Sequence, residues 1–267
     1  MVRLHDRLTE MSGEPFRLGA FARRTARRIV GRVRTATAAT HDGPIAWPEA
    51  RKHYHPHANA ILLDPVVRAA VPQYREIVDQ WLPTRPSADH PPRILFLLNV
   101  LNSAGGVLSV TQLVDDLVAL GADARLAVRS PAGFEPEIPL NTPPLFFRDA
   151  SSLIDFLGKG NDVVVGTLWS TMYYVMEAFR RYRSFTPAYF VQDYEPLFLP
   201  ESHPELRRFA EATYRFTPFC FAKTKWICDR VREVGGQIAL VPPGLDLDRF
   251  KPQSNPPNGN KKIILAM

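Results

Sequence analysis

The sequence is poor in cysteine, with only Cys220 and Cys228 in 267 residues. Their spacing gives neither the Cys-x-x-Cys of a metal or redox site nor the several pairs of a disulfide framework. The composition therefore argues against a disulfide-stabilised secreted domain. We predict that both thiols lie in the core of a cytoplasmic protein.

Long hydrophobic runs are also missing. No stretch reaches the 18 or more apolar residues that a transmembrane helix needs, and the best run, 94–101, is interrupted by Asn99. The N-terminal region lacks the apolar segment and small-residue cleavage site of a secretory signal. These absences argue against a membrane-spanning or secreted protein.

Several motifs that carry chemistry are absent. The sequence contains no G-x-G-x-x-G or G-x-x-x-x-G-K-[ST] loop, no pattern typical of nucleic-acid-binding modules, and no legible Ser/His/Asp or Cys/His set. His53, His55 and His57 alternate, but Pro56 interrupts them and no nearby carboxylate or cysteine completes a metal site. We therefore expect no metal and no cofactor, no nucleic-acid partner, and an exposed loop at these histidines.

The net charge of +6 is concentrated near the start of the chain. The segment from Arg17 to Arg34 contains no acidic residue, and its apolar side chains recur at helical spacing. One reading is a basic amphipathic helix that rests on the anionic lipids of the inner membrane. The other is a solvated tail, and the sequence leaves both open.

The chain divides into three parts. Residues 1–92 are rich in Arg, Ala and Pro without a strand–helix rhythm, which predicts a helical, partly disordered preface. From Arg93 to about residue 252, apolar strands alternate with helices, which predicts an α/β fold with a doubly wound, Rossmann-like parallel sheet. Strands are expected at 93–99, 124–128, 141–147, 162–167, 188–191, 219–223 and 237–241, and helices at 107–120, from Ser151, and at 170–183, 203–214 and 226–234.

The last part, residues 253–267, begins with a linker rich in Pro, Asn and Gly. The run K-K-I-I-L-A-M from Lys261 to Met267 then has the composition of a fresh buried strand. Because one strand cannot bury its apolar faces alone, we expect Lys261 to open a second domain.

The central stretch of the sequence runs from Ala188 to Pro200. An apolar run, A-Y-F-V, changes abruptly to the polar residues Gln192, Asp193 and Glu195, with Tyr194 between them. Polar groups at the carboxyl end of a buried strand are where open α/β sheets place ligands. The alternative is a turn whose acidic side chains cap the next helix.

Other loops at the same sheet edge add to this stretch. A loop with Ser103, Gly105 and Gly106 follows the first strand and opens a helix, which is an arrangement suited to a phosphate or sugar phosphate. Polar and aromatic side chains beside amides and carboxylates suit a sugar, and Asp193 or Glu195 could orient or deprotonate an acceptor hydroxyl. The remaining candidates for this crevice are Thr167, Trp169, Lys223, Thr224, Lys225 and Trp226.

Three motifs together resemble the N-terminal half of a GT-B glycosyltransferase of family 4, also called group 1. They are L-N-S-A-G-G after the first strand, F-A-K-T-K-W-I-C at the penultimate helix, and V-P-P-G-L-D-L-D-R-F-K-P before the linker. The run Y-F-V-Q-D-Y-E-P more narrowly resembles the WsaF-type rhamnosyltransferases of bacterial surface glycans. The resemblance covers residues 93–267.

The resemblance implies two Rossmann-like domains across a cleft, the N-terminal one binding a glycan or lipid-linked acceptor. The donor would be a dTDP- or UDP-sugar, rhamnose in the narrower version, and transfer would retain the anomeric configuration without a metal. Gly105 and Gly106 would approach the donor diphosphate, and the hinge would contain Gly244, Asp246 and Phe250. The acceptor pocket would be lined by Thr167, Trp169, Gln192, Asp193, Tyr194 and Glu195.

The sequence departs from the family in one respect. The E-x7-E motif that holds the donor lies in the family's C-terminal domain, and no two glutamates of this chain have that spacing. We therefore expect this chain alone to be inactive in sugar transfer. The alternative function is a non-catalytic module that binds a carbohydrate or a membrane surface.

Overall fold

The computed structural model describes residues 43–45, 64–81, 89–129 and 140–244. Its centre is a seven-stranded sheet in the order β3-β2-β1-β4-β5-β6-β7. Every neighbouring pair of strands is parallel, which confirms the predicted doubly wound, Rossmann-like α/β fold. The strands are β1 (Arg93–Leu98), β2 (Asp123–Val128), β3 (Pro144–Phe146), β4 (Val163–Gly166), β5 (Thr186–Val191), β6 (Cys220–Ala222) and β7 (Ile238–Leu240).

The central strands are buried on both faces, as their unbroken apolar composition requires. In β1, residues Leu95 to Leu98 are buried. In β5, residues Pro187 to Val191 are buried. Registers are continuous, with Ile94 opposite Ala124 on one side of β1 and opposite Val163 on the other. These strands hold their carboxyl ends at one common edge.

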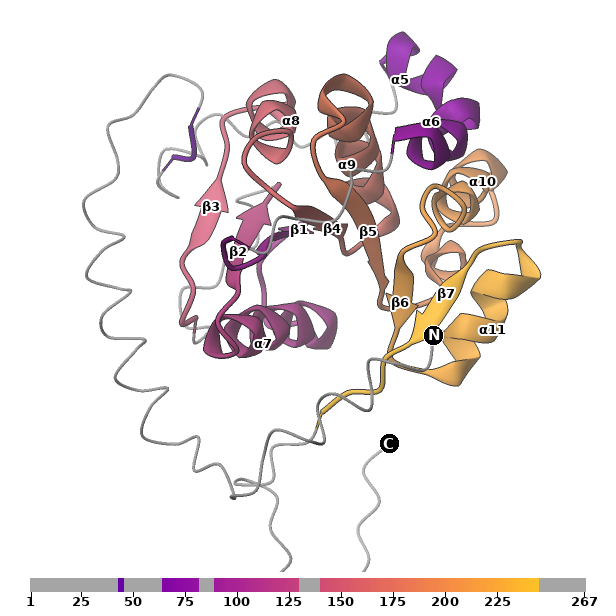
Figure 1. Cartoon of the computed structure of the whole chain (residues 1–267). Coiled ribbons are helices and arrows are strands. Elements are labelled where there is room, and N and C mark those ends of the chain that lie inside the picture. The colour runs from indigo at the N-terminus through magenta and orange to yellow at the C-terminus, as the bar shows by residue number, and fades with distance from the viewer. Residues whose placement is uncertain (1–42, 46–63, 82–88, 130–139, 245–267) are drawn as a thin grey trace, which may run out of the picture.

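Helices cover the two faces unequally, as Figure 1 shows. One face carries α7, whose Val107, Val110 and Val114 pack on alternate side chains of the strands. The opposite face carries the larger core, built around α9. The helices after β1 are α7 (Gly105–Ala119), α8 (Ala150–Leu157), α9 (Trp169–Tyr182), the 3-10 turn η2 (Glu195–Phe198), α10 (Pro204–Thr213) and α11 (Lys225–Glu233).

Part of the predicted preface belongs to the same body. Residues 64–81 form α5 (Pro65–Ala70), the 3-10 turn η1 (Val71–Gln73) and α6 (Tyr74–Trp81). Val67, Tyr74 and Val78 are buried in the larger core, and the Tyr74 ring meets Phe216 edge-on at 5.0 Å between centroids. The helical expectation is therefore confirmed for these residues, which pack on the sheet domain rather than standing apart from it.

The predicted elements all form where the structure describes them, with small shifts at their ends. The clearest correction is at α7, which begins at Gly105 rather than at residue 107, so both glycines belong to its first turn and not to the loop. Cys220 and Cys228 are unpaired and buried, as predicted. Several expected features lie outside the described residues: the basic segment 17–34, the three histidines, Asp246, Phe250 and the strand 261–267.

Candidate functional site

The carboxyl ends of β1 and β4 mark the switch point of the sheet. From β1 the chain moves to β2 on one side, whereas β4, β5, β6 and β7 extend on the other. Open α/β sheets bind ligands in the crevice outside such a point. The loops after β1, β4, β5 and β6, together with the first turns of the helices that follow them, hold the described candidates other than Gly244.

Gln192 connects three of these loops. Its side-chain Nε2 donates to the Thr167 carbonyl oxygen at 2.9 Å, which fixes the orientation of the amide. Its Oε1 faces Gly106 of α7 and has no hydrogen-bond partner, although the atom is buried. Thr167 is itself buried and donates its hydroxyl to the Leu97 carbonyl of β1 at 2.8 Å. Hydrogen bonds between neutral groups thus link the loops after β5 and β4 to β1 at the switch point.

The two glycines at the start of α7 differ in their surroundings. A Cβ on Gly106 would clash with Gln192 Oε1, so a larger residue would require this amide to move. A Cβ on Gly105 would meet nothing within 4 Å. Gly106 therefore serves packing within the protein, whereas the space beside Gly105 is open to a ligand.

Lys223 spans the crevice from the end of β6 to α7. Its Nζ donates to Ser109 Oγ at 2.6 Å and lies 5.7 Å from the centroid of the Phe190 ring. The Ser109 hydroxyl in turn donates to the Gly105 carbonyl at 2.8 Å. Among the described residues no carboxylate pairs with Lys223, and partial burial lowers the pKa of its ammonium. A cation beside the positive end of a helix, without a counter-charge, is suited to an anion.

Glu195 is placed differently from the expectation. Its carboxyl is buried, with Oε2 accepting from the Trp169 backbone N–H and from the Tyr189 hydroxyl at 2.9 Å. Its Oε1 is buried without a partner, and desolvation raises its pKa to about 8. Because this carboxyl lies inside the protein at the start of α9, it is not positioned to take a proton from an acceptor. Glu195 caps the start of α9, the helix that precedes it in the sequence, and not the helix that follows it.

The aromatic candidates also differ in whether the ring is buried or exposed. Trp169 is 7% exposed and packs edge-on against Tyr173, so its face is not offered to a sugar. Tyr194 is partly buried, stacks on Tyr214 and donates its hydroxyl to Glu211 at 3.1 Å. Trp226, 48% exposed at the first turn of α11, is the candidate whose ring remains available.

The other candidates on these loops have local roles. Thr224 caps α11 by accepting from the Ile227 N–H at 3.3 Å, and exposed Lys225 pairs with Asp229 at 2.6 Å. Asp193 is partly buried and accepts from the N–H of Tyr194 at 2.7 Å. With Glu195 inside the core, Asp193 is the acidic candidate that remains at the crevice. Ser103 lies exposed between β1 and α7, and Gly244 is exposed beyond β7.

Sequence reasoning missed Arg129. It follows β2 directly, donates from Nε to Asn99 Oδ1, and lies over the Tyr174 ring at 5.6 Å from its centroid. Asn99 follows β1, so this pair adds a second cation with a neutral partner to the same sheet edge. The available signal was its position as the first residue after a predicted strand.

Neither models of known protein families nor the curated proteins give a match to this sequence. Within the described ranges, no group of His, Cys, Asp or Glu side chains could hold a metal ion. The helices of those ranges are too short or too polar to cross a bilayer.

Proposed function

We propose that this protein is the acceptor-side part of a retaining glycosyltransferase with two Rossmann-like domains, which uses a nucleotide sugar to extend a bacterial surface glycan. Rhamnose carried by dTDP is the specific version of this proposal. The crevice at the carboxyl ends of β1, β4, β5 and β6 would hold the reacting groups. The contacts to the donor nucleotide would come largely from a second domain.

The observation that carries the proposal is the environment of Lys223. Its ammonium lies against the first turns of α7, where the helix end is positive, and its hydrogen-bond acceptor there is the neutral hydroxyl of Ser109. An anion bound in the open space beside Gly105 would supply the missing negative charge and meet free N–H groups of the helix. The diphosphate of a nucleotide sugar has this chemistry.

The remaining contacts support a sugar beside that anion. Asp193 offers a carboxylate at the end of β5 that can accept a hydrogen bond from a sugar hydroxyl. Trp226 offers a partly exposed ring on α11 against which a sugar can stack. Glu195 takes the indirect role of joining the loop after β5 to the start of α9, which holds Asp193 in position.

Calorimetric titration with dTDP and UDP tests the phosphate part of the proposal. We expect Lys223→Met to weaken binding at least about tenfold, which corresponds to about 1.4 kcal/mol. Lys225→Met is the matched control, because Lys225 is exposed and already paired with Asp229, and it should change the affinity less than about twofold. Thymidine and uridine, which lack phosphate, are the negative controls for both proteins, because the nucleoside contacts are assigned to a second domain.

Equal affinity of dTDP for the original protein and Lys223→Met would contradict the site. Transfer is tested separately, in a protein that also carries a donor-binding domain. There Asp193→Asn should weaken acceptor binding, and unchanged kinetics would remove Asp193 from the acceptor site. Sugar transfer by residues 1–267 alone would contradict the requirement for a second domain.

A further inference from the structure

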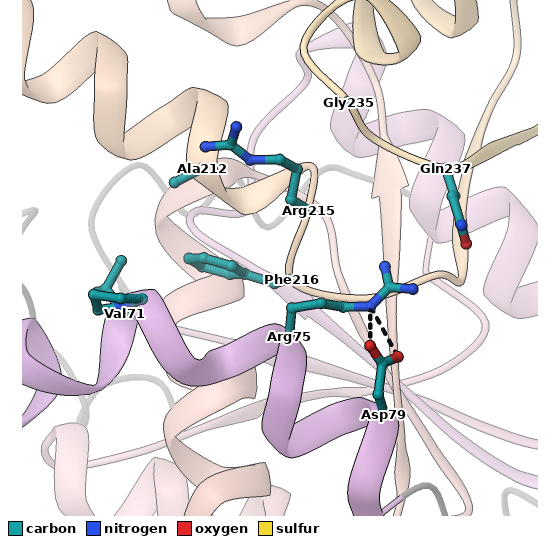
Figure 2. A pocket seen from close by; sticks show the side chains of 9 residues that line it. Val71, Arg75, Asp79, Ala212, Arg215, Phe216, Gly235 and Gln237 are labelled. Carbon is teal, nitrogen blue, oxygen red and sulfur yellow. Dashed lines mark hydrogen bonds and ion pairs between the residues drawn. The ribbon is translucent and has the colours of Figure 1, made fainter.

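A separate cavity lies at the opposite edge of the sheet from the crevice. It has a volume of about 610 Å³, within the range of small-molecule sites. It opens where η1 and α6 meet the end of α10 and the turn between α11 and β7, as Figure 2 shows. The residues that line it are Val71, Pro72, Arg75, Asp79, Ala212, Arg215, Phe216, Gly235 and Gln237.

The charged side chains of this cavity leave one positive charge without a counter-ion. Asp79 is occupied by Arg75, whose Nε donates to both carboxylate oxygens at 2.9 Å. In Figure 2 the two terminal nitrogens of Arg75 point away from Asp79. In the described part of the chain they make no hydrogen bond, and the Arg215 guanidinium has neither a hydrogen bond nor an ion pair. The lining thus holds two guanidinium groups and one carboxylate.

The rest of the lining is apolar or neutral. The Phe216 ring is buried at the base, with Val71 and Ala212 beside it in Figure 2. Gly235 has φ +81°, a conformation that favours glycine, and a Cβ there would come within 3.7 Å of Arg215 Cδ. Gln237 adds an amide beyond Arg75. An apolar base beneath the unpaired Arg215 guanidinium and the terminal nitrogens of Arg75 fits an organic molecule with an anionic end.

We propose that this cavity is a second binding site, which takes a small organic anion whose carboxylate or phosphate is bound by Arg75 and Arg215. The apolar part of the ligand packs on Phe216 and Val71. The site is independent of the proposed glycosyl transfer, because it lies at the amino ends of β6 and β7. It also couples the ligand to the packing of η1 and α6 on the sheet domain, because the cavity has walls from both.

Phenyl phosphate, benzoate and inorganic phosphate are suitable probes, followed by two-dimensional amide NMR. The titrations are done in the Lys223→Met protein, so that the crevice at the other edge does not contribute. We expect phenyl phosphate to shift the Gly235 amide and the Gln237 side chain, and to leave the Gly105 amide unchanged. Tighter binding of phenyl phosphate than of phosphate would show the apolar contribution, and benzoate would show whether a carboxylate suffices.

Substitutions locate the charge contacts. Arg215→Gln and Arg75→Gln should each weaken phenyl phosphate binding at least about fivefold. Asp79→Asn should strengthen it, because the whole Arg75 guanidinium becomes available. Arg208→Gln is the matched control, since Arg208 is exposed on α10 and does not line the cavity. The absence of binding by all three probes, or unchanged binding in Arg215→Gln with Gly235 still shifted, would overturn the proposal.

Discussion

The amino ends and the carboxyl ends of the strands, here called the amino edge and the carboxyl edge, differ in whether ionisable side chains have a partner of opposite charge. At the amino edge, Asp162 accepts from the Arg93 backbone N–H at 2.8 Å and from its guanidinium at 2.7 Å. The hydrogen bonds between them lower the pKa of Asp162 and raise that of Arg93, so both charged forms are stabilised. At the carboxyl edge, burial raises the pKa of Glu195 and lowers that of Lys223, so the charged form of each group is disfavoured relative to water.

This difference separates a structural edge from a candidate binding edge. Charges that find partners within the protein contribute to folding, and they leave little attraction for a ligand. Charges that are buried without a counter-ion cost free energy in the unliganded protein, and they concentrate at functional sites for that reason. The cavity beside α6 differs from the rest of the amino edge, because the exposed Arg215 is not paired there.

The largest expected effect concerns Glu195 and pH. Its folded-state pKa of about 8 lies above the unfolded value near 4.5, so the unfolded chain loses this proton first as pH rises. The group's contribution to stability is therefore full below pH 4.5 and falls as pH approaches 8. Glu195→Gln stays neutral, so its free energy of unfolding should gain about 3 kcal/mol relative to the original protein between about pH 5 and about pH 8.

Urea unfolding at a series of pH values measures this gain. The comparison uses the change with pH and not the absolute difference, because the new amide places a buried NH₂ where Oε1 has no partner. Parallel stability curves for the two proteins would mean that Glu195 is ionised in the folded state, and the contrast between the edges would fail.

The next effect is at the amino edge. Asp162→Asn removes the charge that holds Arg93, and we expect the midpoint of thermal unfolding to fall by about 5 °C at neutral pH. The difference from the original protein should shrink as pH falls through the lowered pKa of Asp162, because protonation removes the same charge. Asp123→Asn is the control, since Asp123 is 51% exposed and lies 3.6 Å from Arg125. Equal melting of the two variants would argue against a structural role for this edge.

A smaller effect separates the two glycines of α7. Gly106→Ala should cost about 1 kcal/mol, because its Cβ displaces Gln192 Oε1 and disturbs the hydrogen bond to Thr167. Gly105→Ala should leave the free energy of unfolding unchanged or slightly raise it, because its Cβ meets nothing. For ligand binding we expect the opposite order, with Gly105→Ala reducing the affinity for dTDP more than Gly106→Ala does. Chemical denaturation and titration of both variants check the two statements.

The smallest expected effect on stability is that of Lys223→Met. The substitution removes a partly desolvated ammonium and no ion pair, so the free energy of unfolding should change by less than about 0.5 kcal/mol or increase. A clear loss of stability on denaturation would show that Lys223 is a structural residue. Together with a loss of dTDP binding, a neutral result would mark it as a binding residue.

The sequence predicted the elements better than the side-chain positions. Apolar runs such as 94–98 and 188–191 predicted strands because a parallel sheet buries both faces, and the helices followed from their periodicity. The convergence of Gly106, Gln192 and Lys223 was also predictable, since the carboxyl ends of parallel strands share one edge.

Burial of individual polar and aromatic side chains was not predictable in the same way. Trp169 and Glu195 were expected at the surface of the crevice, but the start of α9 turns the indole into the core and requires a cap. That cap comes from a residue distant in sequence, so local spacing could not reveal it. Arg129 was missed because a single arginine after a strand has no distinguishing pattern.

The decisive test of the anion-binding crevice is the pKa of Lys223, measured by NMR of its side-chain Cε–Hε with and without inorganic pyrophosphate. We expect a value below that of an ordinary lysine in the free protein, and a rise on addition of pyrophosphate as the anion stabilises the ammonium. An ordinary pKa for Lys223 that pyrophosphate does not alter would contradict an anion-binding crevice at the carboxyl edge.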